Sequence, residues 1–145
     1  MSTYDFDLIV IGGGSGGVRA ARMAAQRGAR VALAEMLGTD GLGGTCVNVG
    51  CIPKKLYSYA AHYAEAFDES YGFGWEGDTP VLNWATLKAN RAREISRLNG
   101  IYGNLLTDSG VTVFDAFARL DGAQAVVLKV NGESGEPQAK EPPAA

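Results

Sequence analysis

Two cysteines, Cys46 and Cys51, carry the strongest redox chemistry in this chain, and they lie five positions apart. Their C-x4-C spacing differs from the C-x2-C spacing of zinc sites, there is no further cysteine, and His62, the single histidine, cannot complete a metal site. We therefore expect no bound metal. In a cytoplasmic protein such a pair is more often a catalytic disulfide than a structural one. The alternative is two buried, inert cysteines at a helix start.

A Cys46–Cys51 bridge sets a condition on the backbone between the two residues. A disulfide needs Cα atoms within about 7 Å of each other. Residues five apart on a regular helix are roughly 8–9 Å apart and point in different directions. The segment must therefore leave helical geometry, which Asn48 and Gly50 allow as residue types. A helix that begins near Cys51 would direct its positive end at the sulfurs and lower the thiol pKa.

A second motif, G-x-G-x-x-G at Gly12, Gly14 and Gly17, indicates dinucleotide binding. Gly12 permits the tight turn, and Gly14 lets a pyrophosphate approach the backbone. Gly17 allows the following helix to pack closely on the preceding strand. The N-terminus of that helix offers free N–H groups and a partial positive charge to the phosphates.

The elements around these glycines are the ones that the motif requires. We expect a buried parallel strand over residues 6–11, a helix over 15–27 and a second strand over 30–35, which together form a βαβ unit of about 30 residues. Glu35 ends the second strand and would accept hydrogen bonds from ribose hydroxyls. An acid there disfavours a 2′-phosphate, so FAD or NAD fits better than NADP. An ordinary glycine-rich turn with a solvated Glu35 is the alternative.

The rest of the chain predicts two longer helices and a strand addition, so the fold class is α/β with a Rossmann-like FAD-binding domain, a disulfide-bearing helix and a long helix across the sheet. Residues 37–50 are glycine-rich and resemble a loop, and residues 68–80 form a polar and aromatic connection. The strand candidates form a small antiparallel or mixed addition with a turn at Asp121-Gly122. The expected helices cover 53–67 and 83–108, and the expected strands cover 111–114, 117–120 and 125–130.

Composition and charge exclude several classes of function. The chain has 145 residues, a mixed charge pattern and a net charge of −3, so no basic stripe predicts nucleic-acid binding. No stretch approaches the roughly 20 apolar residues of a membrane span, and the first residues lack the pattern of a secretory signal. We therefore expect a cytoplasmic protein without membrane contact. Residues 131–145 are Gly, Pro, Glu and Ala without pattern and predict a disordered or aberrant tail.

The segment GGTCVNVGCIPKK at residues 43–55 resembles the redox-disulfide signature of the pyridine nucleotide-disulfide oxidoreductases. The resemblance covers residues 4–130. Dihydrolipoamide dehydrogenases and mercuric reductases in this family usually have Ser where this chain has Lys54. The Lys54-Lys55 pair is similar to glutathione, trypanothione and large thioredoxin reductases. Ser15-Gly16-Gly17 followed by Arg22, and the run SRLNGIY at 96–102, resemble the glutathione reductases in particular.

The resemblance implies a role for each matching residue. Cys51 would lie against the isoalloxazine and accept its electrons, and Cys46 would be the exposed interchange thiol that attacks glutathione disulfide. Lys54 would lie near the flavin N5 edge and tune it by charge. These three residues form the implied catalytic set. The residues implied to bind FAD are Gly12, Gly14, Ser15, Gly16, Gly17, Glu35, Gly44, Thr45, Cys51 and Lys54.

Ser15, Arg22 and Tyr102 are implied to bind glutathione. Arg22 suits a carboxylate because a guanidinium can bind one with two hydrogen bonds. By sequence alone, Arg22 would be an exposed helix charge and Tyr102 a packed helix aromatic. The implied reaction reduces FAD with NADPH, passes two electrons to the Cys46–Cys51 disulfide and ends in thiol–disulfide exchange with glutathione disulfide.

The chain also departs from the family that it resembles. Family members are several times longer, and this sequence has no second dinucleotide motif for NADPH and no interface domain. That domain brings a catalytic His and Glu from the partner subunit of a homodimer, and His62 does not lie in its motif. His62 is expected to be an exposed helix residue. Residues 1–130 thus correspond to the N-terminal, incomplete part of an FAD-binding domain, and we expect no turnover by this chain alone.

Two other functions remain open on the sequence. One is a related flavin disulfide reductase that acts on thioredoxin or trypanothione, against which Arg22 and the 96–102 run argue. The other belongs to a different class, a non-catalytic nucleotide-binding or dimerising fragment that keeps the βαβ unit without a redox-active dithiol.

Overall fold

The computed structural model describes residues 4–130, so the tail predicted at 131–145 lies outside the described residues. The expected βαβ unit is present. Its strands pair in parallel, with Leu8 opposite Val31. At the start of the two strands, the Arg30 guanidinium donates hydrogen bonds to both carboxylate oxygens of Asp7, at 2.8 and 3.2 Å. The unit consists of β1 (Leu8–Ile11), α1 (Ser15–Ala25) and β2 (Val31–Glu35).

The sheet has four strands in the order β1-β2-β3-β4, completed by β3 (Thr112–Leu120) and β4 (Val126–Val130). The prediction of two separate strands at 111–114 and 117–120 was wrong. β3 is continuous: its first part pairs in parallel with β2 and its second part pairs antiparallel with β4. A twisted strand can change partners along its length, which sequence periodicity does not reveal. The predicted turn is confirmed, since the Asp121 N–H donates to the Ala125 carbonyl at 2.9 Å and Gly122 has φ +79°.

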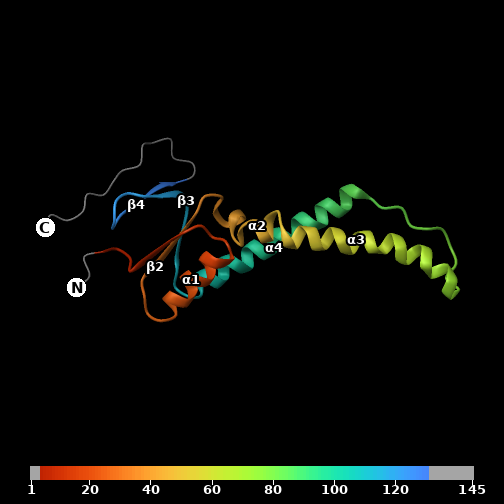
Figure 1. The fold of residues 1–145 in the computed structure, drawn as a ribbon, viewed down its shortest axis with the longest axis horizontal. Helices are drawn as coiled ribbons and strands as arrows, with labels where there is room; N and C mark the ends of the chain where they lie inside the picture. Colours follow the sequence, from red (N-terminus) through yellow and green to blue (C-terminus); the bar gives the residue numbers. More distant parts are fainter. Residues whose placement is uncertain (1–3, 131–145) are drawn as a thin grey trace.

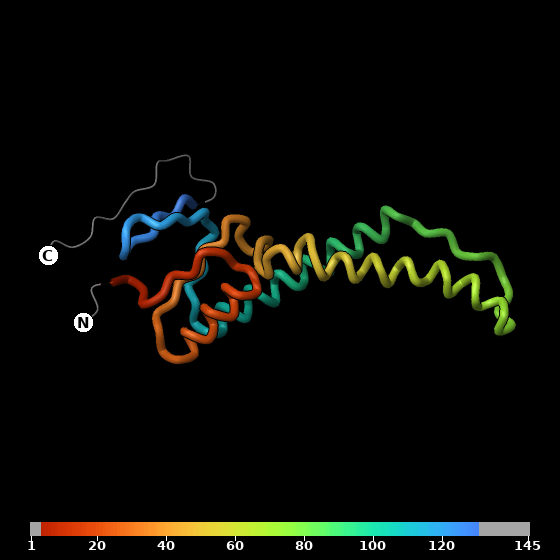
Figure 2. The backbone as a smooth tube through the Cα atoms, viewed as in Figure 1, coloured from red at the N-terminus to blue at the C-terminus, as the bar shows by residue number. Residues whose placement is uncertain are grey.

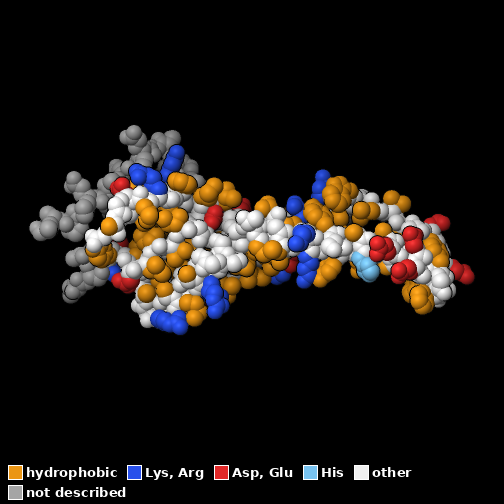
Figure 3. Space-filling view, in the orientation of Figure 1, with side chains coloured by type: hydrophobic (Ala, Val, Ile, Leu, Met, Phe, Trp, Pro, Cys, Tyr) orange, Lys and Arg blue, Asp and Glu red, His pale blue; other side chains and the backbone are white. Residues whose placement is uncertain are grey.

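Two long helices follow the disulfide region, as predicted. They are α3 (Cys51–Ser70) and α4 (Trp84–Thr107). The Asn83 side chain caps α4 by accepting a hydrogen bond from the Thr86 N–H at 3.0 Å. Their connection begins with a short 3₁₀ helix, η2 (Tyr71–Phe73). Figures 1 and 2 show that α3 and α4 lie side by side and extend away from the sheet as an arm. Acidic side chains gather near the far end of this arm (Figure 3).

The segment 37–50, predicted as a loop, contains two short helical elements. They are η1 (Gly38–Gly41) and α2 (Gly44–Asn48). Helices this short are not stable in isolation, so tertiary contacts hold them. Helix propensity does not predict these two elements, because the segment contains many glycines and glycine is a poor helix former.

β1 was predicted to be a buried strand, and the structure corrects this. Its residues Leu8, Ile9 and Ile11 are 38, 37 and 48% exposed, because β1 is an edge strand in the part of the chain that is described. β2, by contrast, is buried along its whole length. The apolar sequence of β1 is typical of a central strand, but burial depends on a neighbour that the strand itself does not encode.

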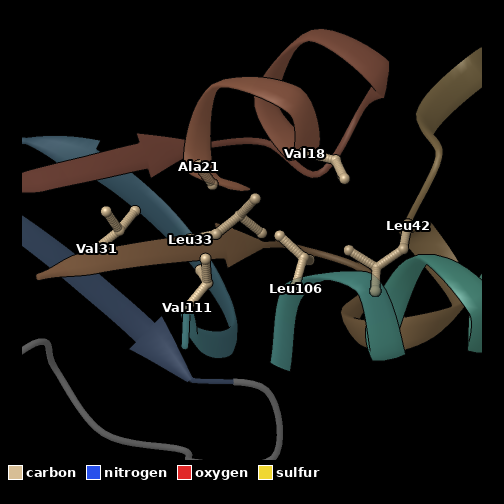
Figure 4. Packing of buried hydrophobic residues seen from close by; sticks show 7 residues of the cluster. All are labelled: Val18, Ala21, Val31, Leu33, Leu42, Leu106 and Val111. Carbon is tan, nitrogen blue, oxygen red and sulfur yellow. The ribbon is translucent and has the colours of Figure 1, made fainter. Parts of the chain in front are cut away.

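The hydrophobic core lies between the sheet and the helices α1 and α4 (Figure 4). Leu33 from the centre of β2 and Leu106 from the last turn of α4 are completely buried within it. The core therefore joins the βαβ unit to the C-terminal end of α4. The buried members of the cluster are Val18, Ala21, Val31, Leu33, Leu42, Leu106 and Val111.

Replacing Leu106 with Ala is expected to lower the free energy of unfolding by about 2–5 kcal/mol, because it leaves a cavity where the helix meets the sheet. Leu82→Ala is the matched control, since Leu82 is 64% exposed. Urea unfolding followed by circular dichroism measures both. Equal effects of the two substitutions would contradict this account of the core.

Candidate redox-disulfide and nucleotide site

The two cysteines lie on different helices, as a bridge between them requires. Cys46 is in α2, and Cys51 is the first residue of α3, so the backbone leaves helical geometry between them as predicted. Gly50 makes the reversal possible with φ −120° and ψ −116°. A Cβ at this position would lie 2.8 Å from the Thr45 carbonyl oxygen and 3.1 Å from the Cys46 Cα. Glycine is therefore required for the chain to fold back on α2.

The ionisation of Cys46 differs from the prediction. The pKa of Cys46 is raised above its ordinary value, first by a hydrogen bond with the Cys51 side chain, then by burial and by the charge of Cys51. The backbone N–H of Cys51, at the start of α3, and the Lys54 ammonium act in the opposite direction but do not prevail. The predicted lowering of the thiol pKa is thus wrong for Cys46, because the hydrogen bond with the Cys51 side chain and burial outweigh the contribution of the helix start. The two side chains interact directly, as a dithiol that forms a disulfide must.

Exposure also differs from the order implied by the resemblance. Cys46, expected to be the exposed thiol, is half-buried, while Cys51 is exposed. Cys46 lies in the middle of α2, which packs against η1, α3 and α4, whereas Cys51 is the first residue of α3.

The glycine turn after β1 has the properties that its motif predicts. Gly12 has φ +100°, a value that side chains rarely adopt. A Cβ on Gly17 would collide with the Gly12 carbonyl oxygen and would lie 3.2 Å from the Val10 side chain. Gly17 therefore permits the close packing of α1 on β1. The turn also contacts the disulfide region, since the Gly43 N–H donates to the Gly13 carbonyl at 2.8 Å.

Glu35 is buried, with 8% of its surface exposed, so the interpretation as a solvated strand end is wrong. Its Oε2 accepts a hydrogen bond from the Gly13 N–H at 2.7 Å, and its Oε1 accepts one from the Leu37 N–H at 3.2 Å. The carboxylate therefore fixes the glycine turn from the end of the neighbouring strand. A carboxylate offers about four acceptor positions, so capacity remains for ribose hydroxyls.

The N-terminus of α1 is open to a ligand. Its N-cap residue, Gly14, makes no side-chain cap, so its first backbone amides receive no hydrogen bond from that side chain. Ser15 and Gly16 are exposed, and no atom lies within 4 Å of where a Cβ of Gly12 or Gly16 would be. Such a cradle of backbone amides fits the pyrophosphate of a dinucleotide. Thr45 and Lys54 are exposed on the neighbouring helices α2 and α3.

Of the residues implied to bind glutathione, Arg22 differs from the exposed helix charge that its type predicts, whereas Tyr102 matches the packed aromatic that its type predicts. Arg22 is half-buried, and its buried Nε has no hydrogen-bond partner among residues 4–130. Tyr102 is partly buried and packs against the core, as expected of a helix aromatic. His62 is exposed on α3, with its Nδ1 3.9 Å from Glu65, as expected.

Two asparagines of the site were not assigned a functional role from the sequence. Asn99 of α4 is buried and donates to the Leu42 carbonyl at 2.7 Å and to Asn48 Oδ1 at 3.0 Å. Asn48 in turn donates to carbonyls around η1 and α2. The available signal was position: Asn99 falls on the helix face of Tyr102 and Leu106, where a polar residue is unusual.

Among residues 4–130 no group of three or more His, Cys, Asp or Glu side chains is arranged to hold a metal ion. No helix in the same range combines the length and hydropathy needed to cross a bilayer.

The sequence pattern of the pyridine nucleotide-disulphide oxidoreductases matches residues 6–139. The chain belongs to this family. It is 47% identical to a glutathione reductase of Burkholderia cepacia over 128 residues, which cover 88% of this chain and 28% of the relative. It is 46% identical to the chloroplastic/mitochondrial glutathione reductase of Pisum sativum over 131 residues, or 85% of this chain and 24% of the relative.

Membership in the oxidoreductase family does not by itself select the substrate. A thioredoxin reductase of Plasmodium falciparum is 41% identical over 138 residues, which cover 90% of this chain and 26% of that protein. The chain thus spans about a quarter of the length of these relatives.

In the reduced chain, alkylation of Cys46 by iodoacetamide is expected to rise with pH at a midpoint above that of an ordinary thiol. Cys51→Ser should lower this midpoint, because it removes the side chain that chiefly raises the pKa of Cys46. Lys54→Met should raise it further, and Lys88→Met on α4 should leave it unchanged. Mass spectrometry of quenched samples measures the midpoint. An unchanged midpoint in Cys51→Ser would contradict the coupling.

Proposed function

We propose that this chain is the N-terminal, FAD-binding and redox-disulfide part of an NADPH-dependent glutathione-disulfide reductase. One observation supports this most strongly: Cys46 and Cys51 interact directly across a helix break, and the same segment is hydrogen-bonded to a dinucleotide-binding glycine turn. A dithiol next to a nucleotide cradle is what electron transfer from a flavin to a disulfide requires.

FAD would be held by the glycine turn and the amides of α1, with its ribose on Glu35. Gly12, Gly14 and Gly16 leave room for the pyrophosphate, and Gly44, Thr45 and Lys54 provide the facing surface. When bound, FAD supplies two-electron transfer from NADPH to the cysteine pair. A flavin that covers Cys51 would leave Cys46 as the more accessible sulfur, which reconciles the proposed roles with the exposures of the chain.

The cysteine pair would reduce glutathione disulfide in two exchanges. The Cys46 thiolate attacks one sulfur of glutathione disulfide, forms a mixed disulfide and releases one glutathione thiolate, which takes up a proton. Cys51 then loses its proton and attacks the Cys46 sulfur, which releases the second glutathione. The substrate disulfide gains two electrons, and the pair becomes the Cys46–Cys51 disulfide.

The raised pKa of Cys46 makes the first exchange dependent on a base. His62 cannot serve, since it follows Cys51 by eleven residues on α3, about 16 Å along the helix. We propose that the base is a His–Glu pair from the second subunit of a homodimer in the parent enzyme. The 145-residue chain would then exchange thiols slowly and show no NADPH-dependent turnover.

Glutathione is the proposed substrate because Arg22 presents a half-buried guanidinium with an unpartnered Nε near the end of α1. Such a group fits a carboxylate of the tripeptide. Ser15 and Tyr102 complete the proposed substrate site. A thioredoxin reductase is the second candidate, favoured by the similarity to relatives of that name. A cytoplasmic location is part of the same proposal, since a dithiol that cycles suits a reducing compartment.

Arg22→Ala is expected to slow the reaction of the reduced chain with glutathione disulfide by about tenfold, because a charge-assisted contact to a carboxylate is lost. The same substitution should not affect the reaction with hydroxyethyl disulfide, which has no carboxylate. Arg19→Ala, on an exposed position of α1, is the control. Thiol titration over time measures the rates. Equal slowing with both disulfides would oppose a glutathione site, and the absence of any dithiol–disulfide cycling would favour the non-catalytic fragment.

Purified chain supplied with FAD is expected to retain near-stoichiometric flavin, seen in its visible absorption spectrum. Alkylation of Cys51 in the reduced protein should then be slower than in the flavin-free chain, because the ring system covers the exposed sulfur. Gly17→Ala should abolish both effects, since its Cβ collides with the Gly12 carbonyl. A folded but colourless wild-type chain would mean that FAD binding needs further segments of the parent enzyme.

A further inference from the structure

Asn99 is one of two polar side chains that are buried in the described part of the chain, the other being Glu35. It is 3% exposed and lies in α4, more than forty residues from the disulfide region in sequence. A buried amide is costly unless it is hydrogen-bonded. Both of its observed bonds go to the segment that carries Cys46: one to the Leu42 carbonyl at 2.7 Å and one to Asn48 Oδ1 at 3.0 Å.

Asn48 extends these bonds into a relay. Its Nδ2 lies 3.2 Å from the Gly41 carbonyl oxygen, 3.4 Å from that of Leu42 and 3.0 Å from that of Gly44. Carbonyl oxygens only accept hydrogen bonds, so the NH₂ group of Asn48 must face them and its Oδ1 must face Asn99. The same argument orients Asn99. The two amides thus link α4, the loop before α2 and the first residue of α2.

The relay acts on the element whose position decides the redox pair. α2 has five residues, and Cys46 is at its centre. A helix this short does not hold its own geometry, so outside contacts determine where it lies. Cys51, by contrast, begins a helix of 20 residues, which is long enough to hold its own geometry more firmly and which also contacts α4. Cys46 is therefore the sulfur whose placement depends on a tether.

We propose that Asn99 is a positioning residue for the redox pair: through Asn48 it holds α2 so that Cys46 stays within bonding reach of Cys51. Asn99 is not a catalytic residue, because its hydrogen bonds go to Leu42 and Asn48 and reach neither sulfur. The inference rests on the proposed function, in which the pair cycles between dithiol and disulfide. Loss of the tether lets α2 sample positions in which the sulfurs are apart, which disfavours the disulfide relative to the dithiol.

The test is the equilibrium of the 145-residue chain with glutathione, in which the dithiol and one glutathione disulfide convert to the Cys46–Cys51 disulfide and two glutathione thiols. Asn99→Asp keeps the side-chain shape but removes the NH₂ donor. We expect it to lower the equilibrium constant for disulfide formation by about tenfold, which corresponds to the loss of one buried hydrogen bond. Alkylation of the remaining thiols and mass spectrometry give the constant at each glutathione ratio.

Val31→Ala separates positioning from general destabilisation. Val31 is buried in β2 and makes no contact in the relay, so this variant should unfold more easily yet keep the wild-type equilibrium constant. If Asn99→Asp does not fold, Asn48→Ala carries the test, because it breaks the relay at its half-buried end and leaves Asn99 bonded to Leu42. We expect Asn48→Ala to lower the equilibrium constant for disulfide formation by the same factor.

The outcomes separate this inference from the proposed function. A relay variant that is folded and keeps the wild-type constant would overturn the positioning role while the pair still cycles. A wild-type chain that forms no Cys46–Cys51 disulfide at any glutathione ratio would overturn the proposed function, and the inference with it.

Discussion

The architecture of the site depends on the close approach of two glycine-rich segments. The Gly43 N–H donates to the Gly13 carbonyl, and Gly14 and Gly43 form an isolated parallel bridge. A Cβ on Gly44 would lie 2.8 Å from the Gly14 Cα, so side chains on these segments would force them apart. This contact brings the nucleotide turn after β1 to the helix that carries Cys46. Electron transfer between a nucleotide cofactor and a disulfide requires that proximity.

Around this contact, hydrogen bonds from buried side chains hold the backbone in place. Glu35 binds the Gly13 amide from one side, and Asn99 binds the Leu42 carbonyl from the other. Both residues are buried, and each joins segments that are far apart in sequence. Because an unsatisfied buried polar group is costly, these bonds favour one arrangement of the loops over others. The glycines allow the loops to meet, and the side-chain bonds determine how they meet.

The cysteine pair shows how a neighbouring side chain can outweigh a helix terminus. Cys51 begins α3 and its backbone N–H lowers the pKa of Cys46, yet that pKa is raised overall, first by the hydrogen bond with the Cys51 side chain. The raised pKa of Cys46 makes its proposed reaction with a disulfide dependent on a base, which the proposed homodimer would supply.

The sequence by itself determined the family, the βαβ unit, the two long helices and the break between the cysteines. It could do so because these features depend on local patterns: glycines at Gly12, Gly14 and Gly17, apolar residues at helical spacing, and the Cys46–Cys51 interval. Only the tertiary structure decided which strand is an edge, how β3 changes partners, and which of the cysteines is exposed. It also decided the burial of Glu35 and the relay through Asn99. Burial, strand partners and pKa values depend on groups brought together from distant parts of the chain, and no local pattern records which groups those are.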